Sequence, residues 1–346
     1  MFLWSGVRIL CKVLRFRCFF VILHKIYVVE RRVLITGASG FIGSFLCEES
    51  LRRGWDTWAA LRATSSRRWL KYEGLNFVEL DLTDTSSLTS HLSSFTTPWN
   101  VVIHAAGATK CIRQEEFDFH NYECTRHLVE ALKSADKMPK QFIYLSSLSA
   151  TYGSAYGNSK LKAEQWLHET LDDSDTDLVV FRPTGVYGPR EKDYFMMAQS
   201  IGRHVDFAVG HEPQMLTFVY VKDLVGAIMN AVERGVTEGT FNVTDGGEYT
   251  SRAFSDLIQQ EMGVKHVVHI TAPLWVLKAV SEVSEDLAKM TGRPSTLNRD
   301  KYKMMAQRDW RCDISGMKDV LGYEPQWDLA RGVKETIAWY KENNWI

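Results

Sequence analysis

The sequence lacks an excess of charge of either sign and lacks paired cysteines. Its 346 residues carry 41 Lys and Arg against 42 Asp and Glu, so bulk electrostatics gives no reason to expect a nucleic-acid partner. The six cysteines are scattered without a C-x-x-C pair. That pattern favours small buried thiols in a reducing compartment over disulfides, and hence a cytoplasmic protein.

The sequence also offers little to a metal ion. His266 and His269 stand three apart, but the stretch VKHVVHI predicts a strand. Side chains three apart on a strand point to opposite faces, whereas a metal site needs ligands that converge. We therefore expect no metal site.

The first 30 residues differ in character from all that follows. They carry five Lys or Arg, and their longest apolar run extends only from Cys18 to Leu23. A spanning helix needs about 20 apolar residues, and no small-residue cleavage site marks a signal peptide. Two interpretations stay open: an amphipathic membrane-surface segment, or sequence upstream of the true start. We favour the second, so membrane contact is expected only if this extension belongs to the protein.

Short apolar runs alternate with helical patterns from Arg32 onward. Strands separated by helices form right-handed β-α-β units and a doubly wound parallel sheet. We therefore predict an α/β protein with a Rossmann-type domain at 31–184 and 216–246, after the extension at 1–30. A smaller, mostly helical substrate-binding cap is expected at 185–215 and 247–346. The predicted strands are 32–36, 57–62, 76–81, 101–106, 141–147 and 177–184.

The stretch VLITGASGFIGSFL places three glycines between the first strand and the first helix. Gly37 allows the tight turn, Gly40 lets a pyrophosphate approach the backbone, and Gly43 lets the helix pack closely. The helix N-terminus offers free N–H groups and a positive dipole to phosphates. The turn therefore predicts a dinucleotide site. Its predicted residues are Gly37, Ser39, Gly40, Phe41, Ile42 and Gly43.

This G-x-x-G-x-x-G spacing and a series of later motifs resemble the short-chain dehydrogenase/reductase superfamily, and within it the extended epimerase/dehydratase branch. The motifs are LDLTD at 80–84, HAAG at 104–107, NYECT at 121–125 with its structural Asn, RPTGVYGP at 182–189 and a C-terminal stretch similar to the closing helices of this branch. The resemblance implies an NAD(P)-dependent oxidoreductase. It assigns adenine contacts to Asp81 and Leu82, the turn beneath the cofactor to Ala105, Ala106 and Gly107, and the nicotinamide wall to Pro183, Thr184 and Val186.

Tyr156 and Lys160 stand four apart on a predicted helix and therefore share one face. An ammonium near a phenol favours the phenolate, so we expect Lys160 to lower the pKa of Tyr156 from ~10 toward neutrality. Tyr156 would then act as general acid/base, while Lys160 also holds the nicotinamide ribose. The resemblance places a substrate-binding hydroxyl at Ser147, with Ser146 and Ser149 as alternatives.

The end of the second strand indicates which nicotinamide cofactor binds. A carboxylate about 20 residues after the glycines usually accepts the ribose 2′-OH of NAD, whereas an Arg accommodates the 2′-phosphate of NADP. Here Arg62 stands at that place with Arg67 nearby, and Asp56 lies at the wrong end of the strand. We therefore expect NAD(P), with NADP favoured, although these arginines would also suit an ordinary solvated surface.

Three functions stay open for such a chain. The first is hydride transfer between nicotinamide and a ketone or secondary alcohol of a fairly apolar small molecule, as in dihydroflavonol-reductase-like and hydroxysteroid-dehydrogenase-like members. The second is a nucleotide-sugar epimerase or dehydratase with tightly bound NAD. The third is a cofactor-binding protein without catalysis, which the intact Ser147, Tyr156 and Lys160 disfavour. A homodimer is compatible with each.

The cap carries information on the choice between the two enzyme classes. Sugar-nucleotide enzymes commonly place an Arg just before the FVYV strand to clamp the diphosphate, whereas this chain has Met215, Leu216 and Thr217 there. Arg190 and Arg299 are the candidate substitutes. We favour the first function because a set of apolar side chains in the cap, most of them expected to pack in its core, would leave a few facing inward to line an apolar pocket. These are Tyr194, Phe195, Met196, Met197, Phe207 and Trp275.

Overall fold

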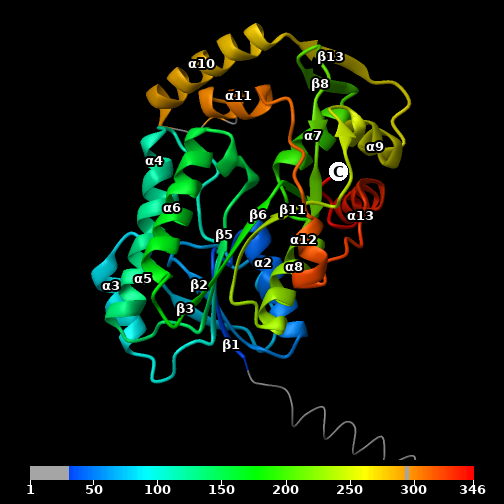
Figure 1. Ribbon diagram of the computed structural model, residues 1–346. Coiled ribbons are helices and arrows are strands. Elements are labelled where there is room, and N and C mark those ends of the chain that lie inside the picture. The colour runs from blue at the N-terminus through cyan, green and yellow to red at the C-terminus, as the bar shows by residue number, and fades with distance from the viewer. Residues whose placement is uncertain (1–30, 293–294, 296) are drawn as a thin grey trace, which may run out of the picture.

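A seven-stranded parallel sheet forms the centre of the protein. The computed structural model describes residues 31–292, 295 and 297–346, so the extension expected at 1–30 lies outside the described residues (Figure 1). The sheet has the order β11-β6-β5-β4-β1-β2-β3, which confirms the predicted doubly wound α/β fold. Its strands are β1 Arg32–Thr36, β2 Asp56–Leu61, β3 Asn76–Glu79, β4 Val101–His104, β5 Gln141–Leu145, β6 Asp177–Pro183 and β11 Glu238–Val243.

Alternation along the strands produces two apolar layers, one on each face of the sheet. In β1, Val33 and Ile35 join one cluster while Leu34 joins the other, because successive strand residues point to opposite faces. All three are fully buried. The first cluster is covered by α2 Phe41–Arg52, α8 Val221–Arg234 and α12 Ser315–Leu321. The second is covered by α3 Thr85–Ser93, α5 Cys124–Ser134 and α6 Ala155–Leu171.

The cap lies over the carboxyl ends of the strands (Figure 1). Its apolar cluster joins α7, α9 and α13. The strand expected around the two histidines begins only at Val268, so His266 precedes it, and His269 bonds Asp206 on the neighbouring strand at 3.1 Å. The cap elements are α7 Asp193–Gly202, β8 Val205–Val209, α9 Ala253–Met262, β13 Val268–Ala272, α10 Leu274–Thr291, α11 Arg299–Ala306 and α13 Leu329–Glu342.

Short pieces connect the cap to the sheet. The strand β7 Gly185–Tyr187 pairs in parallel with β10 Phe218–Tyr220, and β9 Met215–Leu216 pairs antiparallel with β12 Tyr249–Thr250. Before α5 the chain forms α4 Glu115–Phe117 and a π-helix, η1 Asp118–Glu123. A 3₁₀ turn, η2 Leu148–Thr151, follows β5. These irregular segments lie at the strand ends, where the predicted site residues stand.

Cys47, Cys111 and Cys124 are buried free thiols, and Cys312 is a partly exposed one. Within 31–292, 295 and 297–346, none of the helices combines the length and apolarity needed to cross a bilayer. In the same ranges no three His, Cys, Asp or Glu side chains gather as metal ligands would.

A buried ion pair anchors the helix α6 to the sheet. The Glu164 side chain is 3% exposed, and both Nε and Nη2 of Arg182 on β6 donate to it. We predict that Arg182→Ala costs about 3–5 kcal/mol of unfolding free energy, because it leaves a carboxylate buried and unpaired. Lys162→Ala should cost under about 1 kcal/mol, because the Lys162–Asp118 pair is about half exposed. Equal losses for the two variants in urea denaturation would contradict this reading.

Candidate active site

The turn after β1 accepts only glycine at two places. Gly37 has φ +67°, and a Cβ added there would lie 2.6 Å from the carbonyl oxygen of Ala105. A Cβ on Gly43 would lie 2.1 Å from the carbonyl oxygen of Gly37, so α2 packs directly on the turn. The same two glycines thus bring the β1 turn, the β4 turn and the start of α2 together.

The start of α2 has the properties of a phosphate site. Its N-cap is Gly40, no side chain caps the helix, and its first turn holds no acidic residue. A Cβ on Gly40 would meet, among described atoms within 4 Å, only the carbonyl oxygen of Gly37 at 3.1 Å. Ser39, Phe41 and Ile42 are partly exposed around it. Uncapped N–H groups beside an accessible backbone fit the pyrophosphate of a dinucleotide.

A buried histidine fixes the neighbouring turn after β4. His104 Nδ1 lies 2.7 Å from Thr36 Oγ1 on β1, and Nε2 lies 2.9 Å from Thr125 Oγ1 on α5. Burial, aided by the charge of Lys160, lowers the pKa of His104 to about 3. The imidazole is therefore neutral at pH 7 and serves as a bridge. It holds the start of the turn Ala105–Gly107 against β1.

Asn121 connects that turn to the helix α6. Its Oδ1 accepts from the Ala108 N–H at 2.8 Å, and its Nδ2 donates to the Ala108 carbonyl and to Ser159 Oγ at 3.0 and 2.9 Å. A Cβ on Gly107 would stand 2.7 Å from Asn121 Oδ1 and 3.0 Å from Lys160 Nζ. Gly107 and Lys160, predicted from separate motifs, are therefore neighbours. The role of Ser159 and the π-helix around Asn121 were missed, although YGNSK places Ser159 three residues after Tyr156.

Tyr156 and Ser147 meet at the start of α6. Tyr156 lies in the first turn of the helix, and the Ser147 side chain forms a hydrogen bond with the phenol that lowers its pKa. Ser147 Oγ also accepts from the Ser149 N–H at 3.1 Å as the cap of η2. Ser146 and Ser149 are each 3% exposed, whereas Ser147 is partly exposed. Of the three serines, Ser147 thus has the geometry of a site hydroxyl.

Lys160 does not act on Tyr156 as predicted. Burial raises the pKa of Tyr156, with the Ser147 hydrogen bond opposing it, so the expected lowering by Lys160 is wrong. The reason is orientation: Lys160 Nζ donates to the Leu145 carbonyl at 2.9 Å and lies 4.9 Å from the Tyr144 ring centre. Burial lowers the pKa of Lys160 itself to about 8. Tyr156 is therefore a protonated phenol at pH 7.

The adenine side of the predicted site lies at the ends of β2 and β3. Arg62 is exposed after β2, and the Arg67 guanidinium stacks 4.4 Å above the Phe77 ring. The Thr83 N–H and hydroxyl, with a smaller contribution from Arg62, lower the pKa of Asp81. The Leu82 carbonyl lies 3.0 Å from Nδ1 of His127 on α5. No carboxylate of the described chain forms an ion pair with either arginine.

The position before β10 carries no cation in the structure. Thr217 is 5% exposed, and its hydroxyl donates to the Trp310 carbonyl at 2.7 Å and lies 2.8 Å from Thr184 Oγ1. Pro183 and Thr184 are buried at the end of β6, and Val186 packs against the sheet core. The residues predicted to line the nicotinamide site therefore contact Thr217, which in turn contacts the cap segment around Trp310.

Both candidate substitute cations are paired with other groups. Arg190 bonds Ser44 Oγ, Glu48 and the Tyr72 hydroxyl at 3.0, 2.9 and 3.2 Å, which holds it against α2. Arg299 pairs with Glu285 at 3.0 Å and with Asp286 at 3.6 Å inside the cap. A diphosphate would have to break one of these networks to gain a cation.

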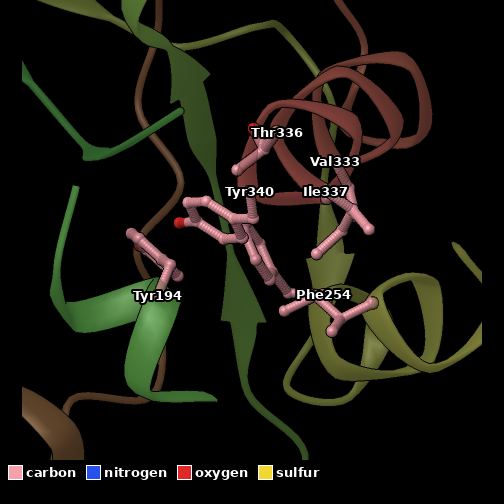
Figure 2. A pocket seen from close by; sticks show the side chains of 7 residues that line it. Tyr194, Phe254, Val333, Thr336, Ile337 and Tyr340 are labelled. Atoms are coloured by element: carbon pink, nitrogen blue, oxygen red, sulfur yellow. The ribbon is translucent and has the colours of Figure 1, made fainter. Parts of the chain in front are cut away.

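The cap aromatics do not gather into the expected pocket. Met196, Phe207 and Trp275 are 43%, 62% and 73% exposed. Tyr194 stacks on Phe254 at 4.5 Å, Phe195 packs on Tyr340 at 5.2 Å, and Met197 packs against the cap core. Figure 2 shows the hollow there, lined by side chains of α7, α9 and α13, with Tyr194 as the one member of this set among them. The other five pack in the cap core or are exposed, and a helical pattern could not tell which of them would line a pocket.

Comparisons with known proteins show the family to which the chain belongs. A family model described as the NAD dependent epimerase/dehydratase family matches residues 33–244. The chain belongs to this family. It is therefore an NAD(P)-dependent oxidoreductase of the extended short-chain dehydrogenase/reductase type, as the motifs implied.

The relatives differ in the substrates that their names give. A UDP-glucose 4-epimerase of Vibrio cholerae is 25% identical over 91% of this chain and 98% of its own length. The decarboxylating sterol-4-alpha-carboxylate 3-dehydrogenase of Saccharomyces cerevisiae is 22% identical over 90% and 98%. The fold is similar to that of a mutant UDP-glucuronic acid 4-epimerase of Bacillus cereus, solved in complex with a fluorinated UDP-sugar and NAD. The TM-score is 0.71 at 19% identity, over 90% of this chain and 99% of the other. This likeness supports the fold.

Substitutions at Tyr156 and Lys160 test the assigned chemistry. Tyr156→Phe should lower kcat about 10²–10⁴-fold, because it removes the transferable proton, and leave cofactor affinity nearly unchanged. Lys160→Ala should impair both kcat and cofactor binding, because its ammonium lies against Gly107. The measurements are steady-state kinetics and cofactor titration by fluorescence. Wild-type turnover by Tyr156→Phe would remove this tyrosine as the acid/base.

Proposed function

We propose that the protein transfers a hydride between NADP(H) and a ketone or secondary alcohol of a fairly apolar small molecule. The observation that carries this proposal is the cation-free position before β10. There Thr217 is buried against the Trp310 carbonyl, and both nearby candidate arginines are held by carboxylates. An apolar substrate needs no cation, whereas a buried diphosphate without one is costly. The proposed cap at 185–215 and 247–346 would enclose the substrate over the domain at 31–184 and 216–246.

The protonation state of Tyr156 suits the reduction direction. When bound, the nicotinamide would supply the hydride. Tyr156 would donate its phenolic proton to the carbonyl oxygen, which the Ser147 hydroxyl orients. Burial raises the pKa of Tyr156 above its ordinary value, so the phenol stays protonated through neutral pH. Loss of this proton donor should begin only at alkaline pH.

The residues around the glycine turn support the cofactor assignment. The proposed contacts are the free N–H groups of α2 for the pyrophosphate and Lys160 beside Gly107 for the ribose. At the adenine end Arg62 and Arg67 carry positive charge without a partner carboxylate in the described ranges, which favours a 2′-phosphate. Asp56, at the start of β2, cannot serve as the NAD-type carboxylate. It forms an ion pair with Arg32 and accepts a hydrogen bond from the Asn76 side chain.

The alternative is a nucleotide-sugar epimerase or dehydratase with tightly bound NAD. The named activities of the Vibrio and Bacillus proteins favour it, since both act on UDP-sugars by name. The yeast relative, named for a sterol carboxylate, favours an apolar substrate equally. Both substrate classes thus occur among these relatives, and the paired arginines support the first function.

Cofactor choice is tested at Arg62. NADPH should bind more tightly than NADH, and Arg62→Ala should narrow this difference in affinity about ten- to a hundredfold, because one charge-assisted hydrogen bond contributes about 1.5–3 kcal/mol. Arg52→Ala, which removes an exposed arginine at the far end of α2, is the matched control and should change neither affinity. An enzyme that prefers NADH, with a preference indifferent to Arg62, would refute the assignment.

Ligand-induced stabilisation distinguishes the two substrate classes. In the presence of NADPH or NADP⁺, apolar ketones or alcohols should raise Tm by about 2 °C or more, because a ligand that binds only the folded state stabilises it. UDP- and dTDP-sugars at millimolar concentration should leave Tm unchanged. A clear shift with any nucleotide sugar would promote the epimerase alternative.

A further inference from the structure

A carboxylate of the cap lies against the helix that carries Tyr156. Asp300 stands in α11, and it is 3% exposed. Its Oδ1 accepts from the Ala155 N–H at 2.5 Å and its Oδ2 from the Tyr156 N–H at 3.3 Å. The one side chain thus binds the first two amides of α6 across 144 residues of sequence. Sequence reasoning missed this contact because nothing in either motif refers to the other.

These amides need an outside partner. The first turn of any helix leaves N–H groups without intrahelical acceptors. In α6 the N-cap Ser154 accepts from the Gly157 N–H, which leaves the amides of Ala155 and Tyr156. A buried carboxylate at a helix N-terminus is also stabilised by the helix dipole. Asp300 therefore completes the cap of α6, and no Lys or Arg in the described ranges forms an ion pair with it.

The helix α11 is itself held firmly in the cap. Asn298 caps it by accepting from the Lys301 N–H at 2.8 Å, and Glu285 of α10 accepts from the Arg299 N–H at 3.0 Å. Lys301 Nζ lies 3.7 Å from Asp193 of α7. That same Asp193 pairs at 2.5 Å with Lys110 of the loop after β4. These contacts fix α11 within the cap. The position of the Asp300 carboxylate therefore depends on the position of the cap.

We propose that Asp300 is a positioning residue that couples the cap to Tyr156. The phenol projects from the first turn of α6, the turn whose amides Asp300 holds. A misplacement of about 1 Å at a reacting group costs on the order of 10²-fold in rate. The contact of α11 with α6 therefore determines the position and orientation of the Tyr156 phenol. The proposal rests on the proposed role of Tyr156 as acid/base, and it is independent of the substrate class.

The test compares two helix caps in the full chain. Asp300→Ala removes both acceptors, and Asp300→Asn keeps one. Asp328→Ala is the matched control, because Asp328 caps α13 by accepting from the Arg331 N–H at 2.8 Å and is none of the predicted site residues. Hydrogen exchange of the amides at Ala155 and Tyr156 is measured with the kcat and the KM for cofactor.

Asp300→Ala should speed exchange of the α6 amides at least tenfold and lower kcat at least tenfold, with KM for NADPH within twofold of wild type. Asp300→Asn should lie between the two. Asp328→Ala should speed exchange only in α13 and leave kcat unchanged. Unchanged α6 exchange in both Asp300 variants would overturn the proposal, whatever the substrate proves to be. Faster exchange with wild-type kcat on any turned-over substrate, nucleotide sugars included, would overturn it as well. If Asp300→Ala does not fold, Asp300→Asn decides by the same measures.

Discussion

The site depends on the contact between two backbone turns at the carboxyl ends of β1 and β4. Gly37 can approach Ala105 only because it has no Cβ, and Gly107 leaves space for the Lys160 ammonium. His104 connects the turn after β4 to β1, and Asn121 holds the same turn through the Ala108 amide. A larger residue at Gly37 or Gly107 would force apart the groups proposed to hold the phosphates and the nicotinamide ribose. The helix α6, the glycine turn after β1 and the sheet are thus held in place relative to one another through two glycines.

Much of this arrangement could be predicted from local patterns. The strand at 32–36 was predicted to the residue, because a short buried strand beside a glycine turn is a strong signal. Tyr156 and Lys160 share a helix, as their spacing required. The direction of the Lys160 ammonium could not be predicted, because the Leu145 carbonyl that binds it belongs to another element. Asp300 could not be predicted for the same reason. Which of the cap aromatics would pack in the core could not be predicted either, because core and pocket walls share one composition.

The use of positive charge in the structure favours an apolar substrate. Arg190 ties the segment after β7 to α2, Arg299 ties α11 to α10, and Lys110 with Lys301 converges on Asp193. These four cations are thus engaged in joining elements. Arg62, by contrast, stands at the adenine end with no partner carboxylate in the described chain. Arg62 could therefore pair with a 2′-phosphate. The arginines that a diphosphate-linked sugar would need, Arg190 and Arg299, are already paired with carboxylates.

The central claim is that the cofactor enters and leaves with each turnover, as in a reductase, instead of staying bound and being recycled. Native mass spectrometry of the protein as purified tests it most directly. The account predicts protein without stoichiometric dinucleotide, which takes up one NADPH per chain on addition and releases it on dialysis. Stoichiometric NAD that copurifies and survives dialysis would contradict the account and favour an epimerase.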